Sequence, residues 1–221
     1  MFLAFGIGIA AAVALVAVGA LFRGQGDAPP PVQTPVVELS GIPQDNTLLG
    51  KPTARVTLIE YVDAQCPGCR YYTLSMFPTI VKNYVRPGKV KIEYRGFPFI
   101  GSDSVKALQF ILAAGRQNRL FQLQEALYRH QGNENSGWVT DDLIRQLART
   151  IGGLDVQKLF ADAASDEVTR TANQAEPEAS AAGIPGTPTF FVRIGNQQPY
   201  YLRIALDVAE LRAGLDDALK G

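Results

Sequence analysis

The stretch RVTLIEYVDAQCPGCR, residues 55–70, decides the fold. Its first half, residues 55–62, is rich in β-branched, apolar and aromatic side chains, a composition typical of a buried strand. The Cys-Pro-Gly-Cys sequence follows directly and opens a segment with helical spacing of apolar residues that extends to Tyr84. Because proline favours the first position of a helix, Pro67 predicts a helix that begins at this residue and has Cys66 as its N-cap.

The rest of the chain supplies further strands around a long helical block. Additional candidate strands occupy residues 89–95, 189–194 and 199–204. Helical patterns fill about 101–182, and an amphipathic segment closes the chain at 207–219. From this order we expect an α/β domain over residues 47–221, with a mixed sheet and a helical insertion between its two halves.

The N-terminus has a different character. Residues 1–22 carry no charged side chain, and at about 1.5 Å per residue they would form roughly 33 Å of helix, enough to span a membrane. A cleaved signal peptide is the alternative, since Val18-Gly19-Ala20 offers small residues before a cleavage point. Because no basic stretch precedes the apolar run, we favour an uncleaved anchor. Residues 23–46, rich in Pro and Gly, are expected to form a spacer.

Composition and charge narrow the class of protein. Of the 221 residues, 47% are hydrophobic and 19% are charged, which predicts a globular core rather than a disordered chain. The 21 basic and 21 acidic residues balance, and no basic run marks a nucleic-acid surface. The topology of the anchor is ambiguous, because Arg23 alone would place the domain in the cytoplasm by the positive-inside rule.

Cys66 and Cys69 are the two cysteines of the chain. A structural disulfide at this spacing would close a very short loop and would stabilise the fold little. A zinc site normally needs four ligands, and the single histidine, His130, lies far along the chain. Two buried thiols of the core would not need Pro and Gly between them. We therefore interpret the pair as a redox centre that requires no metal and no cofactor.

The position of Cys66 at a helix start has a chemical consequence. Its sulfur would face the free amides of Gly68 and Cys69 and the positive end of the helix dipole. This environment favours the thiolate, which is the attacking species in disulfide exchange. Cys69, one turn further, would be the shielded resolving thiol. Arg70 either adds positive potential or remains a solvated surface residue.

Glu60 lies six residues before Cys66, on the strand face that it shares with the apolar residues Val56, Leu58 and Val62. A carboxylate on an apolar face is costly unless it is used or paired. One interpretation is a proton acceptor or relay for Cys69 with a pKa raised by burial. The other is a carboxylate near the strand end that reaches water.

A third feature is Gly-Thr-Pro-Thr-Phe at residues 186–190. A proline is tolerated at the first residue of a strand. Base rates for X–Pro bonds alone would leave the Thr187–Pro188 bond trans.

Together, Glu-Tyr-Val-Asp-Ala-Gln before Cys-Pro-Gly-Cys, the helical block and Gly-Ile-Pro-Gly-Thr-Pro-Thr-Phe resemble the DsbA-like branch of the thioredoxin superfamily. The resemblance runs from about residue 47 to the C-terminus and implies a thioredoxin-like fold. It implies that Pro188 is a cis-proline facing the cysteines and that the Thr187 backbone pairs with a substrate peptide. Glu60 would be the family's buried acid, Cys66 would form the mixed disulfide and Cys69 would resolve it.

The resemblance also implies a setting and partners. We expect a membrane-anchored, extracytoplasmic dithiol oxidase that acts on the thiols of exported proteins and is re-oxidised by a quinone-linked membrane protein, DsbB-like or VKOR-like. The dipeptide Pro67-Gly68 departs from the Pro-His of well-known oxidases, and Thr187 matches related isomerases. A thiol reductase or isomerase on the same scaffold is therefore the alternative. Residues 23–50 are too few for the isomerases' dimerisation domain, so a monomeric catalytic domain is expected. A third hypothesis is a non-enzymatic, tethered peptide-binding module.

Overall fold

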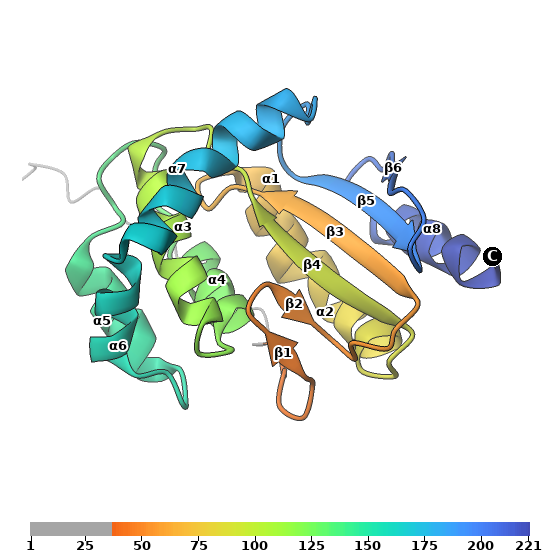
Figure 1. Ribbon diagram of the computed structural model, residues 1–221, viewed down its shortest axis with the longest axis horizontal. Helices are drawn as coiled ribbons and strands as arrows, with labels where there is room; N and C mark the ends of the chain where they lie inside the picture. Colours follow the sequence, from red (N-terminus) through yellow and green to blue (C-terminus); the bar gives the residue numbers. More distant parts are fainter. Residues whose placement is uncertain (1–36) are drawn as a thin grey trace, which may run out of the picture. The chain divides into compact units, whose positions relative to one another are not determined.

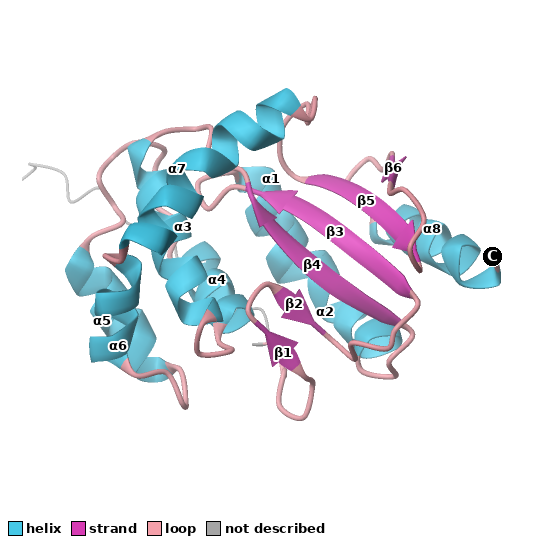
Figure 2. Cartoon of the chain, in the orientation of Figure 1, coloured by secondary structure: helices cyan, strands magenta, loops and turns pink. Residues whose placement is uncertain are grey.

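The computed structural model describes residues 37–221 and shows a six-stranded sheet with helices on both faces (Figures 1 and 2). The strands are β1 Gln44–Asp45, β2 Leu48–Leu49, β3 Val56–Val62, β4 Val90–Gly96, β5 Thr189–Ile194 and β6 Tyr200–Leu202. Their order in the sheet is β1-β2-β4-β3-β5-β6. β3 and β4 run parallel and the other neighbours are antiparallel, so the sheet is mixed, as expected.

The central strand β3 is buried along nearly its whole length because it has strands on both sides and helices over both faces. Leu58 pairs with Ile92 on β4 and Val192 on β5, and all three side chains are fully buried on one face. This row of branched apolar side chains is the centre of the core, and it continues toward the strand end at Glu60.

The connection from β3 to β4 is one continuous helical segment. It comprises α1 Pro67–Tyr71, the π-helical turn η1 Tyr72–Met76, α2 Phe77–Ile80 and a second π-helical turn η2 Val81–Val85. Together with α8, Val208–Lys220, this segment covers the face of the sheet that holds Glu60. The active-site helix predicted from Pro67 to Tyr84 is therefore confirmed.

The helical insertion follows β4 and returns to β5. It contains α3 Ser102–Gly115, α4 Leu120–Arg129, α5 Asp141–Thr150, α6 Val156–Ala163 and α7 Asp166–Ala181. These helices occupy residues 102–181, in the part of the chain where the sequence predicts the insertion. Pro177 lies inside α7, and the helix continues past it to Ala181.

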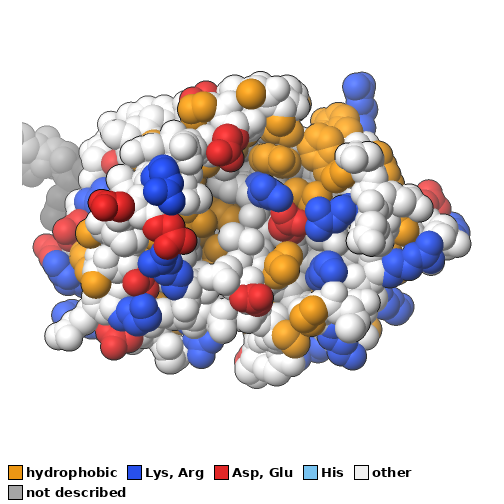
Figure 3. All heavy atoms as spheres, viewed as in Figure 1, with side chains coloured by type: hydrophobic (Ala, Val, Ile, Leu, Met, Phe, Trp, Pro, Cys, Tyr) orange, Lys and Arg blue, Asp and Glu red, His pale blue; other side chains and the backbone are white. Residues whose placement is uncertain are grey.

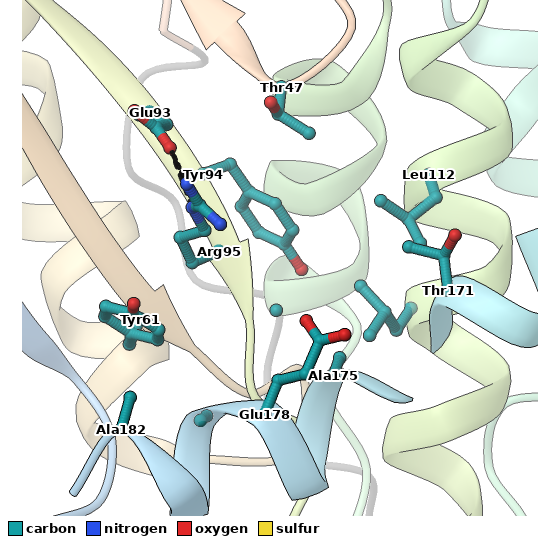
Figure 4. A pocket seen from close by; sticks show the side chains of 13 residues that line it. Thr47, Tyr61, Glu93, Tyr94, Arg95, Leu112, Thr171, Ala175, Glu178 and Ala182 are labelled. Carbon is teal, nitrogen blue, oxygen red and sulfur yellow. Dashed lines mark hydrogen bonds and ion pairs between the residues drawn. The ribbon is translucent and has the colours of Figure 1, made fainter. Parts of the chain in front are cut away.

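The opposite face of the sheet is only partly covered. Helix α7 lies over its β4 side and leaves a cleft of about 490 Å³, into which Glu178 points (Figure 4). On the β5 side, Tyr61, Phe191 and Tyr201 form an aromatic row whose neighbouring ring centroids are 6.0 and 5.5 Å apart. Figure 3 shows hydrophobic side chains gathered on this part of the surface.

The folded chain begins before the expected domain start at residue 47. Leu39 and Ile42 are buried, and β1 pairs with β2. Strands of two residues are too short for an alternating pattern to be visible in the sequence. The last part of the predicted spacer, residues 37–46, is thus part of the domain. The predicted anchor at residues 1–22 lies outside the described residues, and no helix within 37–221 is sufficiently long and apolar to cross a membrane.

Candidate active site

Cys66 and Cys69 lie where β3 leads into α1, at the end of the central strand. Cys66 is the N-cap of α1 and Pro67 is its first residue, as the sequence predicts. The backbone N–H of Cys69 donates to the Cys66 Sγ at 3.3 Å, in the manner of an N-cap side chain. Neither cysteine forms a disulfide in this structure, so its contacts describe the dithiol form of the site.

The two thiols have opposite electrostatic environments. A hydrogen bond from the Cys69 thiol, aided by Thr187 and by the backbone amides of Cys69 and Gly68, lowers the pKa of Cys66 to about 6 although burial acts in the opposite direction. Burial raises the pKa of Cys69 well above its ordinary value, and the neighbouring Cys66 adds to this effect. At neutral pH Cys66 is therefore a thiolate and Cys69 stays protonated.

The loop before β5 completes the site from a distant part of the chain. The Thr187–Pro188 peptide bond is cis, as the resemblance implies and the base rate does not. The carbonyl oxygen of Thr187 lies 3.3 Å from the Cys66 Sγ and accepts a hydrogen bond from Cys66 when this thiol is protonated. Gly68 packs against Pro188, since a Cβ at residue 68 would lie 3.1 Å from the proline Cδ.

Glu60 is fully buried on the face of β3 that packs against the active-site helix. The alternative in which its carboxylate reaches water is therefore wrong. The hydroxyl of Tyr72 donates to Glu60 Oε2 at 2.6 Å, while Oε1 has no hydrogen-bond partner within residues 37–221. Burial raises the pKa of Glu60 to about 7, and the side chains of Tyr72 and Gln124 offset only part of this effect. Such a group can exchange a proton at neutral pH.

Asp63, which the sequence reading did not single out, organises the turn before Cys66. Its Oδ1 accepts hydrogen bonds from the Gln65 backbone at 2.8 Å and from the Ser104 hydroxyl at 2.6 Å. Its Oδ2 accepts one from the Ile100 backbone at 3.1 Å. The carboxyl is buried, and burial raises its pKa. Asp63 therefore ties the catalytic turn to the start of the insertion.

Other residues of the insertion also form hydrogen bonds with the turn around Cys66. The Gln131 side-chain amide donates to the carbonyl oxygens of Ala64 at 2.8 Å and Cys66 at 3.2 Å. The guanidinium of Arg70 donates to the Tyr128 carbonyl at 3.0 Å, so Arg70 is bound to the insertion. These partners lie about 60 residues apart in sequence, and nothing local in the sequence pairs them.

The comparisons agree with this geometry. Residues 43–207 match the model of a protein family described as thioredoxin. The chain belongs to this family. It is 24% identical, over 79% of its length and 77% of the relative, to disulfide bond formation protein D of Bacillus subtilis. The crystal structure of oxidised BdbD from Bacillus subtilis covers 85% of this chain and 98% of its own, with a TM-score of 0.69 at 23% identity. A thioredoxin-like oxidoreductase from Silicibacter pomeroyi covers 81% and 93%, with a TM-score of 0.61 at 27% identity.

Within the thioredoxin family, this chain is a DsbA-like thiol–disulfide oxidoreductase. The helical insertion and the mixed sheet are the features it shares with the solved relatives.

Proposed function

We propose that this protein is an extracytoplasmic dithiol oxidase that donates the Cys66–Cys69 disulfide to exported proteins. The observation that carries the proposal is the placement of the two thiols: Cys66 is the N-cap of α1 and accepts a hydrogen bond from the Cys69 backbone, whereas the Cys69 side chain is fully buried. This placement lowers the pKa of Cys66 and raises that of Cys69. Stabilising the thiolate of Cys66 stabilises the reduced enzyme, and this makes the disulfide a stronger oxidant.

The reaction proceeds in two exchanges. A client thiolate attacks the Cys66 sulfur of the oxidised enzyme, the Cys66–Cys69 bond breaks, and Cys69 leaves with the electron pair. A second client thiolate then attacks the client sulfur of this mixed disulfide and releases Cys66 as a thiolate. The client gains one disulfide and the enzyme holds the two electrons as a dithiol. Cys66 is the exchanging sulfur because it is the more accessible of the two.

In this scheme Glu60 exchanges a proton with the sulfur of Cys69. When Cys69 is released as a buried thiolate it needs a proton, because its thiolate is strongly disfavoured there. A carboxyl with a pKa of about 7 can supply that proton at neutral pH and can take it back during re-oxidation. Glu60 is thus proposed as the proton relay, with Tyr72 holding its carboxylate.

The client approaches along the loop that contains Thr187 and Pro188. An extended client segment would pair with the Thr187 backbone beside the Cys66 sulfur, a form of strand addition. The resemblance supports three further parts of the proposal: a monomeric catalytic domain, attachment through residues 1–22, and re-oxidation by a quinone-linked membrane protein.

Trapping of the mixed disulfide tests this function. The Cys69→Ala variant, with Cys66 first activated as a mixed disulfide with a small aromatic thiol, should accumulate a covalent complex with a reduced client that carries a single cysteine. The client thiolate displaces the small thiol from Cys66, and neither protein then holds a second thiol that can break the complex. The matched Cys66→Ser variant should form none. A tethered peptide-binding module would instead keep its activity in cells after Cys66→Ser, and that result would exclude the oxidase.

A further inference from the structure

The loop between β6 and α8 brings an apolar side chain, Leu206, to the dipeptide between the cysteines. A Cβ placed on Gly68 would lie 3.3 Å from Leu206 Cδ1, 3.1 Å from Pro188 Cδ and 3.6 Å from Cys66 Sγ. Leu206 and Pro188 therefore border the space next to the exchanging sulfur into which a side chain at residue 68 would project. Both side chains would crowd a Cβ at residue 68, so Gly68 lets Leu206 and Pro188 pack directly against the start of α1 beside Cys66.

The backbone of Leu206 is unusual for its residue type. Among residues 37–221, the non-glycine residues with a left-handed backbone are Asn46, Asn118, Asn135 and Leu206. Asparagine tolerates this conformation, whereas leucine adopts it rarely, and Leu206 has a φ of +52°. Such a conformation persists when the surrounding structure imposes it, and it is found disproportionately at functional sites.

Hydrogen bonds fix the chain on both sides of Leu206. Before it, the backbone N–H of Ala205 donates to Glu210 Oε2 at 2.7 Å. After it, Asp207 caps α8, with its Oδ1 accepting from the backbone of Ala209 at 2.7 Å and of Glu210 at 3.0 Å. The start of helix α8 thus holds the loop in place, and the position of Leu206 is built into the fold.

The Leu206 side chain is only partly buried, so part of its apolar surface remains available. A client cysteine bonded to Cys66 must place its neighbouring residue close to Gly68 and Pro188, and hence against Leu206. We propose that Leu206 is a specificity-determining residue that favours client cysteines flanked by an apolar side chain. This inference rests on the proposed function, because it concerns the client in the mixed disulfide.

The size of the preference follows from the surface that remains to be covered. Burying the exposed part of one leucine against an apolar client side chain should change the rate of exchange about fivefold. The effect should appear in the rate with the client and not in the equilibrium between the enzyme's own dithiol and disulfide, because Leu206 carries no charge.

The test uses the oxidised full chain and two cysteine peptides that differ only in having Leu or Ser beside the cysteine. The rate constant of disulfide transfer is measured for the wild type and for Leu206→Asn, since asparagine keeps the left-handed backbone. Leu206→Gly serves as a second variant for the same reason, and Leu219→Asn, at an exposed leucine on α8, is the matched control.

We expect the wild type and Leu219→Asn to oxidise the Leu peptide about fivefold faster than the Ser peptide. Both Leu206 variants should lose this preference through slower oxidation of the Leu peptide, with the Ser peptide rate and the redox potential unchanged. A preference that survives both substitutions, or an equal loss of both rates, would overturn the assignment. Wild-type enzyme that oxidises neither peptide would instead refute the proposed function itself.

Discussion

The fully buried carboxylate of Glu60 accepts a 2.6 Å hydrogen bond from the hydroxyl of Tyr72, which is also fully buried. The two residues come from β3 and from the π-helical turn that follows α1, so the bond joins the central strand to the active-site helix. Burial and the charge on Glu60 both raise the pKa of Tyr72 well above its ordinary value, so its hydroxyl stays protonated and can donate. The Glu60 carboxyl is itself protonated below a pH of about 7.

Glu60 should make the protein less stable as the pH rises. Burial raises its pKa from 4.5 to about 7, so its contribution to stability is complete below pH 4.5 and is lost as the pH passes 7. At pH 8 the Glu60→Gln variant should therefore be more stable than the wild type by up to about 3 kcal/mol, relative to their difference at pH 4. Denaturant unfolding of the oxidised proteins measures this, since oxidised cysteines do not titrate. A difference that does not change with pH would show that Glu60 titrates normally.

Removing the partner of Glu60 should move its pKa further upward. In Tyr72→Phe the ionised carboxylate loses a hydrogen bond, while the ring and its packing against Phe190 are retained. Infrared spectroscopy of the protonated carboxyl group, followed against pH and assigned with Glu60→Gln, should give a pKa above 7. A lower pKa in Tyr72→Phe would mean that the hydroxyl does not stabilise the charged form.

The low pKa of Cys66 should depend on Cys69. The hydrogen bond from the Cys69 thiol is the largest cause of the lowered value, so Cys69→Ala should raise the pKa of Cys66 above about 6. Thiolate absorbance in the ultraviolet follows this titration in the reduced protein. Cys66→Ser is the control and should show no thiolate forming near pH 6. An unchanged pKa in Cys69→Ala would assign the effect to the helix amides alone.

Gln131 should act on the cysteines without touching the client. Gln131→Glu replaces two donated hydrogen bonds to the carbonyls of Ala64 and Cys66 with a negative charge close to the thiolate. We expect the pKa of Cys66 to rise by about one unit and the disulfide to become less oxidising. The same substitution at the exposed Gln198 is the control. If Gln131→Glu lowers the stability but leaves the pKa of Cys66 and the redox potential unchanged, Gln131 only stabilises the fold and does not act on the cysteines.

Local rules predict the centre of the site well. Proline at the first helical position placed Cys66 at the N-cap, and the alternation along β3 placed Glu60 among buried residues. Both inferences depend on neighbours within one turn or one strand. The location of the insertion followed from helical periodicity in the same way.

The remaining parts depend on contacts between distant segments. Ser104 and Gln131 reach the turn around Asp63 only because the insertion folds back over it, and Leu206 reaches Gly68 only through the packing of α8. Side-chain hydrogen bonds of this kind leave no periodic signal in the sequence. The sequence does not predict strands β1 and β2, which have two residues each. They are strands only because they pair within the sheet, and their own composition carries no strand signal.

The equilibrium redox potential of the Cys66–Cys69 pair, measured in the full chain against glutathione buffers, tests the central claim most directly. With the Cys66 thiolate stabilised and the reduced form favoured, we predict a value toward the oxidising end, near about −120 mV. A value near about −270 mV, where thioredoxin lies, would contradict the oxidase and would assign the same cysteines to a reductase.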